Sequence, residues 1–331
     1  KQRQFIDLGT EDTATVLGLI LLLFIAFVSL QVGYLFGGRT TIEATAGLTL
    51  ADYARRGFFE LLAIAGLTLT LLTAIAARTK KIKLATGILV LPLRNPVTLA
   101  KQLSTMDQIS GGRMLPAMAA GWYKREFDAV GVPFEKRGRI MDDNLDIMRR
   151  FFNEDLVSGD WPNHRIPAGV MFPKPVQKPF PILIGGYADR VLKRAATNGD
   201  GWLTYFYKPD AFIESWEKVR NFAEEDGRDP DTVLNGNQLP IMVGESRAAV
   251  EKTMMDWLNV DFDIAQGSKS TMDSAIMGNV DECIEQLKEH IDAGVQKLIF
   301  VPYKYQMDQV EVIAKEIVPK LRAYAAEKQK G

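Results

Sequence analysis

The pattern of apolar and polar positions changes character near Arg78. Two long apolar segments precede it, because residues 14–36 and 61–77 contain no charged side chain. A helix rises about 1.5 Å per residue, so about 20 residues cross a hydrocarbon core about 30 Å thick. The second segment reaches that length with the four residues before it. We therefore predict a transmembrane helical hairpin in residues 1–77, with helices at about 14–36 and 57–77.

Two other interpretations of the apolar segments are open. A signal peptide fits poorly, because the first segment is long and Glu11 and Asp12 precede it. A pair of buried core helices is the second alternative, although core helices normally keep a polar face. Basic residues cluster after the second segment, and such clusters favour the cytoplasmic side. We expect a membrane-associated protein with its second domain on the cytoplasmic side, or a cytoplasmic protein if the hairpin is artefactual.

After Arg78, short apolar segments alternate with charged amphipathic ones, as expected for a parallel sheet covered by helices. The predicted strands are 82–91, 114–120, 182–185, 201–205, 239–243 and 297–301. The predicted helices are 96–109, 124–130, 137–152, 188–197, 209–226, 246–258, 280–293 and 307–328. Residues 78–331 thus predict an α/β domain, an incomplete (β/α)₈ TIM-type barrel with about six strands. The proline-rich insert 155–181 shows little helix or strand signal.

Glycines mark the predicted strand ends, where barrels of this kind carry their active sites. Thr86 and Gly87 interrupt the first strand, and Gly121 follows the second. Gly185 and Gly186 end the third strand directly before a helix, an arrangement that offers backbone N–H groups to a phosphate. The same glycines also suit an ordinary strand-to-helix turn, which is the alternative interpretation.

Composition narrows the possible chemistry. The chain has 40 Lys and Arg against 41 Asp and Glu, so its net charge of -1 gives no reason to expect a nucleic-acid partner. Cys283 is the single cysteine and is expected to be a helix-packing thiol. The two histidines lie far apart, so the sequence predicts no metal site.

Several blocks of the sequence carry a resemblance. They are ATGILVLPLRNP, AAGWYKREFDAVGVPFEKRGRIMDD, PKPVQKPFPILIGG, NGDGW and IMGNVDECIEQLKEHIDAGVQKLIFVP. Together, over about residues 73–321, they resemble the luciferase-like monooxygenase superfamily, and more narrowly its coenzyme F420-dependent oxidoreductase branch. The resemblance implies a barrel that binds coenzyme F420, or alternatively FMN. It also implies hydride transfer with a small-molecule substrate, and a homodimer.

The resemblance further implies which residues bind the cofactor. Thr86 and Gly87 match a strand bulge behind the ring, where the family often has a non-prolyl cis peptide. Gly185 and Gly186 match the turn that contacts phosphate. The other matching positions line the cofactor pocket: Gly121, Trp122, Glu126, Asp200, Gly201 and Trp202. A core position for Trp202 and a capping or solvated position for Glu126 are the alternatives, and no catalytic acid or base is assigned.

The chain departs from this family before Lys81, where the first two barrel strands have no counterpart. Residues 1–72 instead resemble a segment of a multi-spanning bacterial membrane protein family of unknown function, mainly through YARRGFFEL. Three interpretations follow. The chain is a flavin- or deazaflavin-dependent oxidoreductase, impaired if the missing strands supply cofactor contacts. Alternatively, it is a non-catalytic, membrane-anchored relict barrel, or an artefactual gene fusion.

Overall fold

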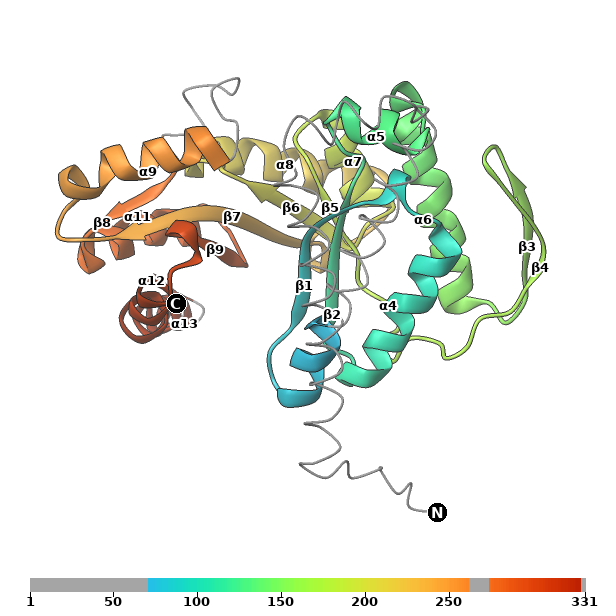
Figure 1. Cartoon of the computed structure of the whole chain (residues 1–331), viewed down its shortest axis with the longest axis horizontal. Coiled ribbons are helices and arrows are strands. Elements are labelled where there is room, and N and C mark those ends of the chain that lie inside the picture. The colour runs from blue at the N-terminus through green and yellow to red at the C-terminus, as the bar shows by residue number, and fades with distance from the viewer. Residues whose placement is uncertain (1–70, 262–273, 329–331) are drawn as a thin grey trace, which may run out of the picture. The chain divides into compact units, whose positions relative to one another are not determined.

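The computed structural model describes residues 71–261 and 274–328 (Figure 1). The chain divides into two compact units, 1–62 and 63–331, and the described residues all belong to the second. The expected hairpin at 14–36 and 57–77 therefore falls mostly outside the described residues. Within the described ranges, no helix is both long and apolar enough to cross a membrane.

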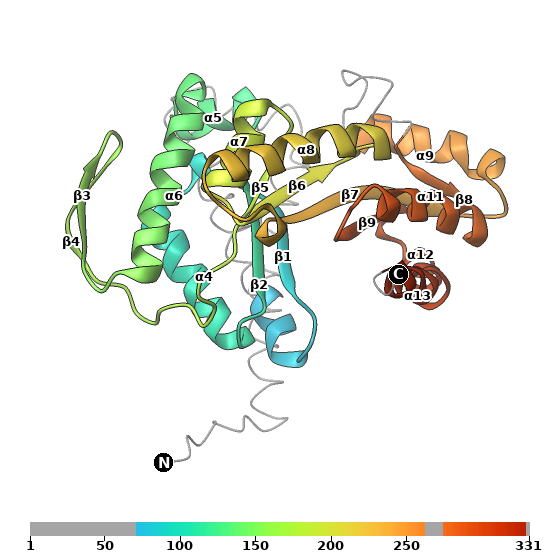
Figure 2. The ribbon, with the colours of Figure 1, turned by 180° about the vertical axis from the view of Figure 1, so that it is seen from behind.

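Among the described residues, seven strands form a parallel sheet that turns strongly between β1 and β7 (Figures 1 and 2). The order is β1-β2-β5-β6-β7, and β7 also pairs with both β8 and β9. The strands are β1 (Leu84–Val90), β2 (Met114–Ala119), β5 (Leu183–Gly185), β6 (Gly201–Tyr205), β7 (Leu234–Val243), β8 (Ile276–Gly278) and β9 (Leu298–Pro302). The six expected strands are confirmed as a curled half-barrel, although β7 begins earlier than expected and β8 was not predicted.

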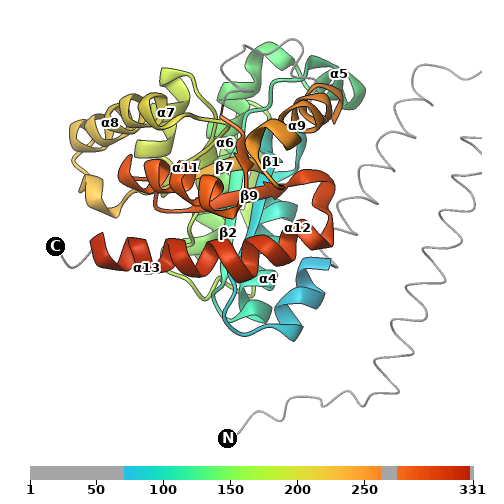
Figure 3. The same ribbon diagram turned by 90° about the vertical axis from the view of Figure 1, so that its left-hand side faces the viewer.

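Helices cover the sheet close to their expected positions. They are α4 (Pro96–Ser110), α5 (Lys124–Val130), α6 (Arg137–Asn153), α7 (Asp189–Thr197), α8 (Pro209–Glu225), α9 (Arg247–Asp261), α11 (Val280–Asp292), α12 (Met307–Val312) and α13 (Val318–Lys328). Local chemistry fixes their ends. The Asn95 side chain caps α4 by accepting from the Thr98 N–H at 3.0 Å, and Gly111 ends that helix at φ 68°. A π-helical turn, Ile313–Ile317, joins α12 to α13, so that the two continue one another (Figure 3).

Two apolar layers hold the helices against the outer face of the sheet. Met114, Met118 and Ile184 belong to the larger core, together with residues of α4, α6, α7 and α8. A smaller core joins Leu239 of β7 to residues of α11, including Cys283. Burial raises the pKa of the Cys283 thiol to about 12, which agrees with the expected packing role.

The insert 155–181 corrects the sequence expectation, because it contains an antiparallel hairpin. β3 (Val157–Trp161) pairs with β4 (His164–Gly169), and Trp161 lies opposite His164 across a two-residue turn. His164 is consequently a strand residue, and its Nε2 lies 2.9 Å from the Asn144 Oδ1 on α6. Pro162 lies in its turn, Pro167 lies in β4, and four more prolines follow, so the proline content of the whole insert concealed the strands at its start.

Residues 71–78 are helical and pack with the sheet domain, since Ala76 belongs to its larger core. The Arg113 guanidinium, just before β2, donates to the carbonyls of Ala76, Thr79 and Ile82. The segment before the expected break at Arg78 therefore leads directly into β1, as the helix before a barrel strand should.

His290 makes the stability of the fold depend on pH. Its side chain is buried on α11, its Nδ1 has no hydrogen-bond partner among the described residues, and burial lowers its pKa to about 4. The unfolded chain binds this proton at a higher pH, so stability is lost as pH falls below about 6.5. We expect the free energy of unfolding to fall by about 2 kcal/mol from this group between pH 7 and pH 5.

Urea unfolding of the wild type and of His290→Leu at both pH values measures this effect. The variant should lose less stability between pH 7 and pH 5, because the group that takes up the proton is absent. Equal losses in the two proteins would contradict the assignment.

Candidate functional site

The register of the strands shows which side chains share the concave side of the sheet. Residues opposite one another in neighbouring strands lie on the same face. Gly185 pairs with Leu203, Leu203 pairs with Gly236, and Tyr205 pairs with Gln238. Leu203 also belongs to a small apolar cluster with Leu115, Ala117 and Leu183. We call the face that carries this cluster the inner face.

Glycines on the inner face are approached by side chains from distant strands. A Cβ on Gly185 would lie 3.2 Å from the Ile88 Cγ2 of β1, so the Ile88 side chain extends across β2 toward β5. A Cβ on Gly87 would lie 3.2 Å from the Gln238 Oε1 of β7. The sheet is therefore curled enough for β1 and β7 to face each other across this side.

Thr86 and Gly87 form the expected bulge in β1. The register with β2 shifts between Thr86 and Leu89, and the peptide bond between Gly87 and Ile88 is cis. The Thr86 hydroxyl donates to the Ala117 carbonyl at 3.0 Å and accepts from the Ala117 N–H at 3.1 Å. The Thr86 side chain thus replaces ladder contacts that the bulge removes, while Gly87 faces Gln238.

Gly121 follows β2 in a conformation that requires glycine. Its φ is +82°, and a Cβ would lie 2.7 Å from Val90 and 2.9 Å from Phe127. Trp122 is 71% exposed beyond it, and its ring centroid lies 5.4 Å from that of Tyr123. Glu126 is exposed in the first turn of α5. The structure therefore places Gly121 in packing contact and Trp122 and Glu126 at the surface near the carboxyl end of β2.

Gly185 and Gly186 lie at the carboxyl end of β5, as expected. Gly186 has φ +137°, and its carbonyl accepts from the Trp202 Nε1 at 2.8 Å. Trp202 is fully buried and stacks on Phe212 at 5.3 Å, so it holds this turn from the helix side of the sheet. No side chain caps the N-terminus of α7, which begins at Asp189. The N–H groups of Asp189 and Arg190 are consequently available beside the turn, whereas that of Val191 donates to the Ala188 carbonyl.

Asp200 and Gly201 lie at the other end of the sheet, where β6 begins. The Asp200 Oδ2 accepts from the Ile182 N–H at 2.7 Å and from the Arg149 Nη2 at 2.5 Å. A Cβ on Gly201 would lie 2.3 Å from the Leu234 carbonyl oxygen. The structure does not bring these residues to the carboxyl ends of the strands, because Asp200 precedes β6 and Gly201 is its first residue.

Three tyrosines beside the glycine turn were missed by the sequence reasoning. Tyr187 follows Gly186, and Tyr205 and Tyr207 lie at the end of the neighbouring strand β6. The Tyr187 ring lies 4.7 Å from Tyr205 and stacks on Tyr207 at 5.2 Å, and its hydroxyl donates to the Tyr205 carbonyl at 3.0 Å. Burial raises the pKa of Tyr187 and of Tyr207, so both phenols are protonated at neutral pH. The sequence feature that could have indicated this cluster is a tyrosine two residues after each of two predicted strands, Tyr187 after strand 182–185 and Tyr207 after strand 201–205.

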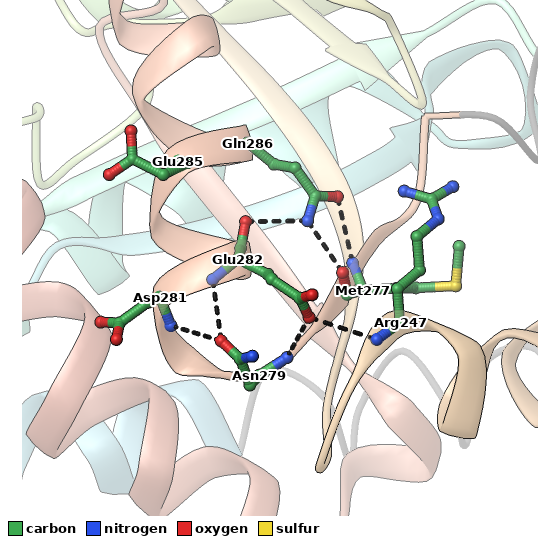
Figure 4. Close-up of a pocket in the computed structure, with 7 residues that line it drawn as sticks. All are labelled: Arg247, Met277, Asn279, Asp281, Glu282, Glu285 and Gln286. Atoms are coloured by element: carbon green, nitrogen blue, oxygen red, sulfur yellow. Dashed lines mark hydrogen bonds between the residues drawn. The ribbon is translucent and has the colours of Figure 1, made fainter.

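A separate cavity of about 560 Å³ lies beside β8 and the start of α11 (Figure 4). Asn279 and Glu282 line it and form the capping box of α11. The Glu282 carboxylate also accepts from the Arg247 N–H at 3.2 Å. These polar groups serve the helix cap, and the cavity lacks the glycine turn of the inner face. Within the ranges that the structure describes, no group of three or more His, Cys, Asp or Glu residues could hold a metal ion.

The family model described as luciferase-like monooxygenase matches residues 49–297. This match starts before the expected break near Arg78 and includes the YARRGFFEL segment. The resemblance of residues 1–72 to a membrane protein family is not shown by the comparisons.

Curated relatives match over part of their length. An uncharacterised protein of Mycobacterium tuberculosis is 33% identical over 161 residues, which are 49% of this chain and 55% of the relative. The FMNH(2)-dependent dimethylsulfone monooxygenase of Pseudomonas putida is 31% identical over 138 residues, 41% of this chain and 38% of that enzyme. The chain thus spans about half, or less, of the length of these relatives.

Solved structures share the fold at low identity. The coenzyme F420-dependent tetrahydromethanopterin reductase of Methanopyrus kandleri matches with a TM-score of 0.64 and 20% identity, over 76% of this chain and 87% of that one. The oxygenating constituent of 3,6-diketocamphane monooxygenase of Pseudomonas putida, in complex with FMN, matches with a TM-score of 0.60 and 18% identity, over 76% and 83%.

Proposed function

Because the chain belongs to the luciferase-like monooxygenase family, we propose that it is a flavin- or deazaflavin-dependent oxidoreductase. The proposed reaction is hydride transfer between the cofactor and a small organic substrate. Coenzyme F420 is the cofactor that we propose first, and FMN is the alternative. One similar structure is F420-dependent and another contains FMN, which supports this class of cofactor.

The observation that carries the proposal is the glycine turn at the carboxyl end of β5. Gly185 lies on the inner face, where a side chain would meet Ile88. Gly186 follows, half-buried, close to the uncapped N-terminus of α7. A planar ring needs a floor without bulky side chains, and a phosphate is favoured by free N–H groups at a helix start. The turn offers both features within two residues.

The residues around the turn suggest how the chain would hold such a cofactor. The β1 bulge at Gly87 shapes the opposite side of the inner face, and Trp202 fixes the Gly186 carbonyl. When bound, the cofactor supplies or accepts the hydride. Tyr187 and Tyr207 form an apolar wall beside the turn and remain neutral, so they would exclude water from the ring without changing its charge.

Titration of the purified chain with F420 and with FMN tests the proposal. We expect saturable one-to-one binding of one of them, seen as a change in cofactor fluorescence. Gly185→Leu should weaken that binding by at least about tenfold, because a large side chain there would push Ile88, which already packs over Gly185, into the space of the inner face. Gly138→Ala is the control. Gly138 lies on α6, outside the inner face, and the added methyl group would lie 3.5 Å from the Arg194 Nη2 of α7. Failure of the wild type to bind either cofactor would refute the proposed function.

Membrane attachment through residues 1–77 and a homodimer are also kept as proposals. Co-sedimentation of the full chain with phospholipid vesicles tests the first, and light scattering tests the second. A chain that stays in the supernatant, or that scatters as a monomer, would contradict the respective proposal.

A further inference from the structure

Gln238 is a polar residue on the inner face that the sequence reasoning did not single out. It lies in β7, opposite Tyr205 of β6 on one side and Ile299 of β9 on the other. Its side chain is half-buried, and its Oε1 reaches within 3.2 Å of the position that a Cβ on Gly87 would occupy. The Gln238 carboxamide therefore points across the inner face toward the β1 bulge.

The carboxamide of Gln238 differs from those of three other glutamines. Gln286 both donates to the Met277 carbonyl and accepts from the Met277 N–H, and Gln309 does the same with Val243. Gln177 donates to Asp107 and to the Met114 carbonyl. Within the described ranges, the Gln238 carboxamide makes no hydrogen bond. A half-buried carboxamide without a partner in the protein is available to water or to a bound molecule on the inner face.

The backbone around Gln238 is fixed even though its side chain is not. Its carbonyl accepts from the Phe206 N–H at 2.9 Å, and strands pair with β7 on both sides. Gly87 has no side chain that could block the space in front of the carboxamide. A planar ligand on the inner face would thus meet a donor and an acceptor on a side chain that is anchored by a fixed backbone and can turn toward the ligand.

We propose that the Gln238 carboxamide binds the pyrimidine edge of the flavin or deazaflavin ring and orients it for hydride transfer. This inference rests on the proposed function. That edge carries an N–H between two carbonyl oxygens, and a carboxamide has one acceptor and two donors. Gln238 can therefore accept from the ring N–H and donate to one ring carbonyl at the same time. FMN and F420 share this edge, so Gln238 is a positioning residue for either cofactor.

The test compares FMN with 3-methyl-FMN, in which a methyl group replaces the hydrogen of that ring N–H. Wild-type protein should bind FMN about tenfold more tightly than 3-methyl-FMN, because the methyl group removes one hydrogen bond. Gln238→Leu should bind FMN about tenfold more weakly than the wild type does and should no longer distinguish the two molecules. Gln108→Leu makes the same chemical change on the exposed side of α4 and should behave as the wild type.

A second variant covers the case in which Gln238→Leu does not fold. Gln238→Glu keeps the shape of the side chain and an acceptor for the ring N–H but removes both donors. It should bind FMN more weakly than the wild type and still reject 3-methyl-FMN. If the wild type binds F420 and not FMN, the loss of F420 affinity in both variants, but not in Gln108→Leu, is the expected result.

The outcomes separate the inference from the function on which it rests. Binding of FMN or F420 to the wild type and to both Gln238 variants with equal affinity overturns the inference and leaves the oxidoreductase proposal standing. Absence of binding to the wild type overturns both. A tenfold loss that is confined to the Gln238 variants supports both.

Discussion

Replacing Arg113 with alanine is expected to lower the free energy of unfolding by about 3–5 kcal/mol. The Arg113 side chain is only 8% exposed and lies between α4 and β2. Its Nη1 donates to the Thr79 hydroxyl at 2.9 Å and to the Ile82 carbonyl at 2.8 Å. Its Nη2 donates to the Ala76 carbonyl at 2.7 Å, and its Nε to the Ser110 carbonyl at 2.6 Å.

The size of this effect follows from the acceptors that Arg113 serves. The carbonyls of Ala76 and Thr79 lie at the end of the helix that precedes β1, where backbone acceptors lack intrahelical partners and a positive charge is favoured. Without the guanidinium these carbonyls lose their partner, and so does the Ile82 carbonyl just before β1. Arg113→Lys should recover only part of the stability, because an ammonium group cannot reach all the acceptors of the planar fork.

Chemical denaturation of the two Arg113 variants measures the change. Arg165→Ala is the control, because Arg165 is 84% exposed and pairs only with the exposed Asp160. It should change stability by less than about 0.5 kcal/mol. An Arg113→Ala protein as stable as the control variant would show that the hydrogen bonds from the guanidinium to residues 76–82 do not stabilise the fold.

Replacing Asp200 with alanine is expected to cost about 2–4 kcal/mol of stability. The carboxylate holds the Ile182 N–H at the start of β5 and the guanidinium of Arg149 on α6. Removing it leaves a backbone donor and a half-buried cation without their partner. Asp200→Asn should cost less, because the amide oxygen can still accept from the Ile182 N–H.

The Asp200→Ala variant also tests whether the Asp200 side chain contacts the cofactor. The sequence resemblance implied that Asp200 lines the cofactor pocket, whereas the structure places it at the amino end of β6. At a temperature where Asp200→Ala remains folded, its affinity for FMN or F420 should match that of the wild type. A large loss of affinity in a folded protein would instead support the pocket role. Asp160→Ala is the control for the loss of an exposed carboxylate.

Residues with local signals were predicted well. The starts of α4 and α11 were predicted at residues 96 and 280, and the structure shows the side-chain caps that set them, Asn95 for α4 and Asn279 with Glu282 for α11. Gly87 was expected beside a cis peptide in the bulge of β1, and the structure has one between Gly87 and Ile88. The strands β3 and β4 were missed because prolines in and after the hairpin, including Pro167 within β4, dominated the composition of their segment.

Residues whose position depends on distant strands were predicted less well. Asp200 precedes β6, and only the assembled sheet shows that its carboxylate accepts from the Ile182 N–H and from Arg149. The stacking of Tyr187 on Tyr207 requires β5 and β6 to be neighbours, which no local pattern reports. Trp202 is an intermediate case, since its burial was an open alternative and its bond to Gly186 emerges only in the fold.

The sequence by itself determined the alternation of strands and helices, the glycine turn at Gly185 and Gly186, and the starts of α4 and α11, because these follow from side chains within a few residues of one another. The tertiary structure alone decided which face of each strand looks inward and which end of the sheet each polar group reaches. Gln238 and Gly87 meet because the sheet curls, and that curl results from the twist accumulated over all the strands between them.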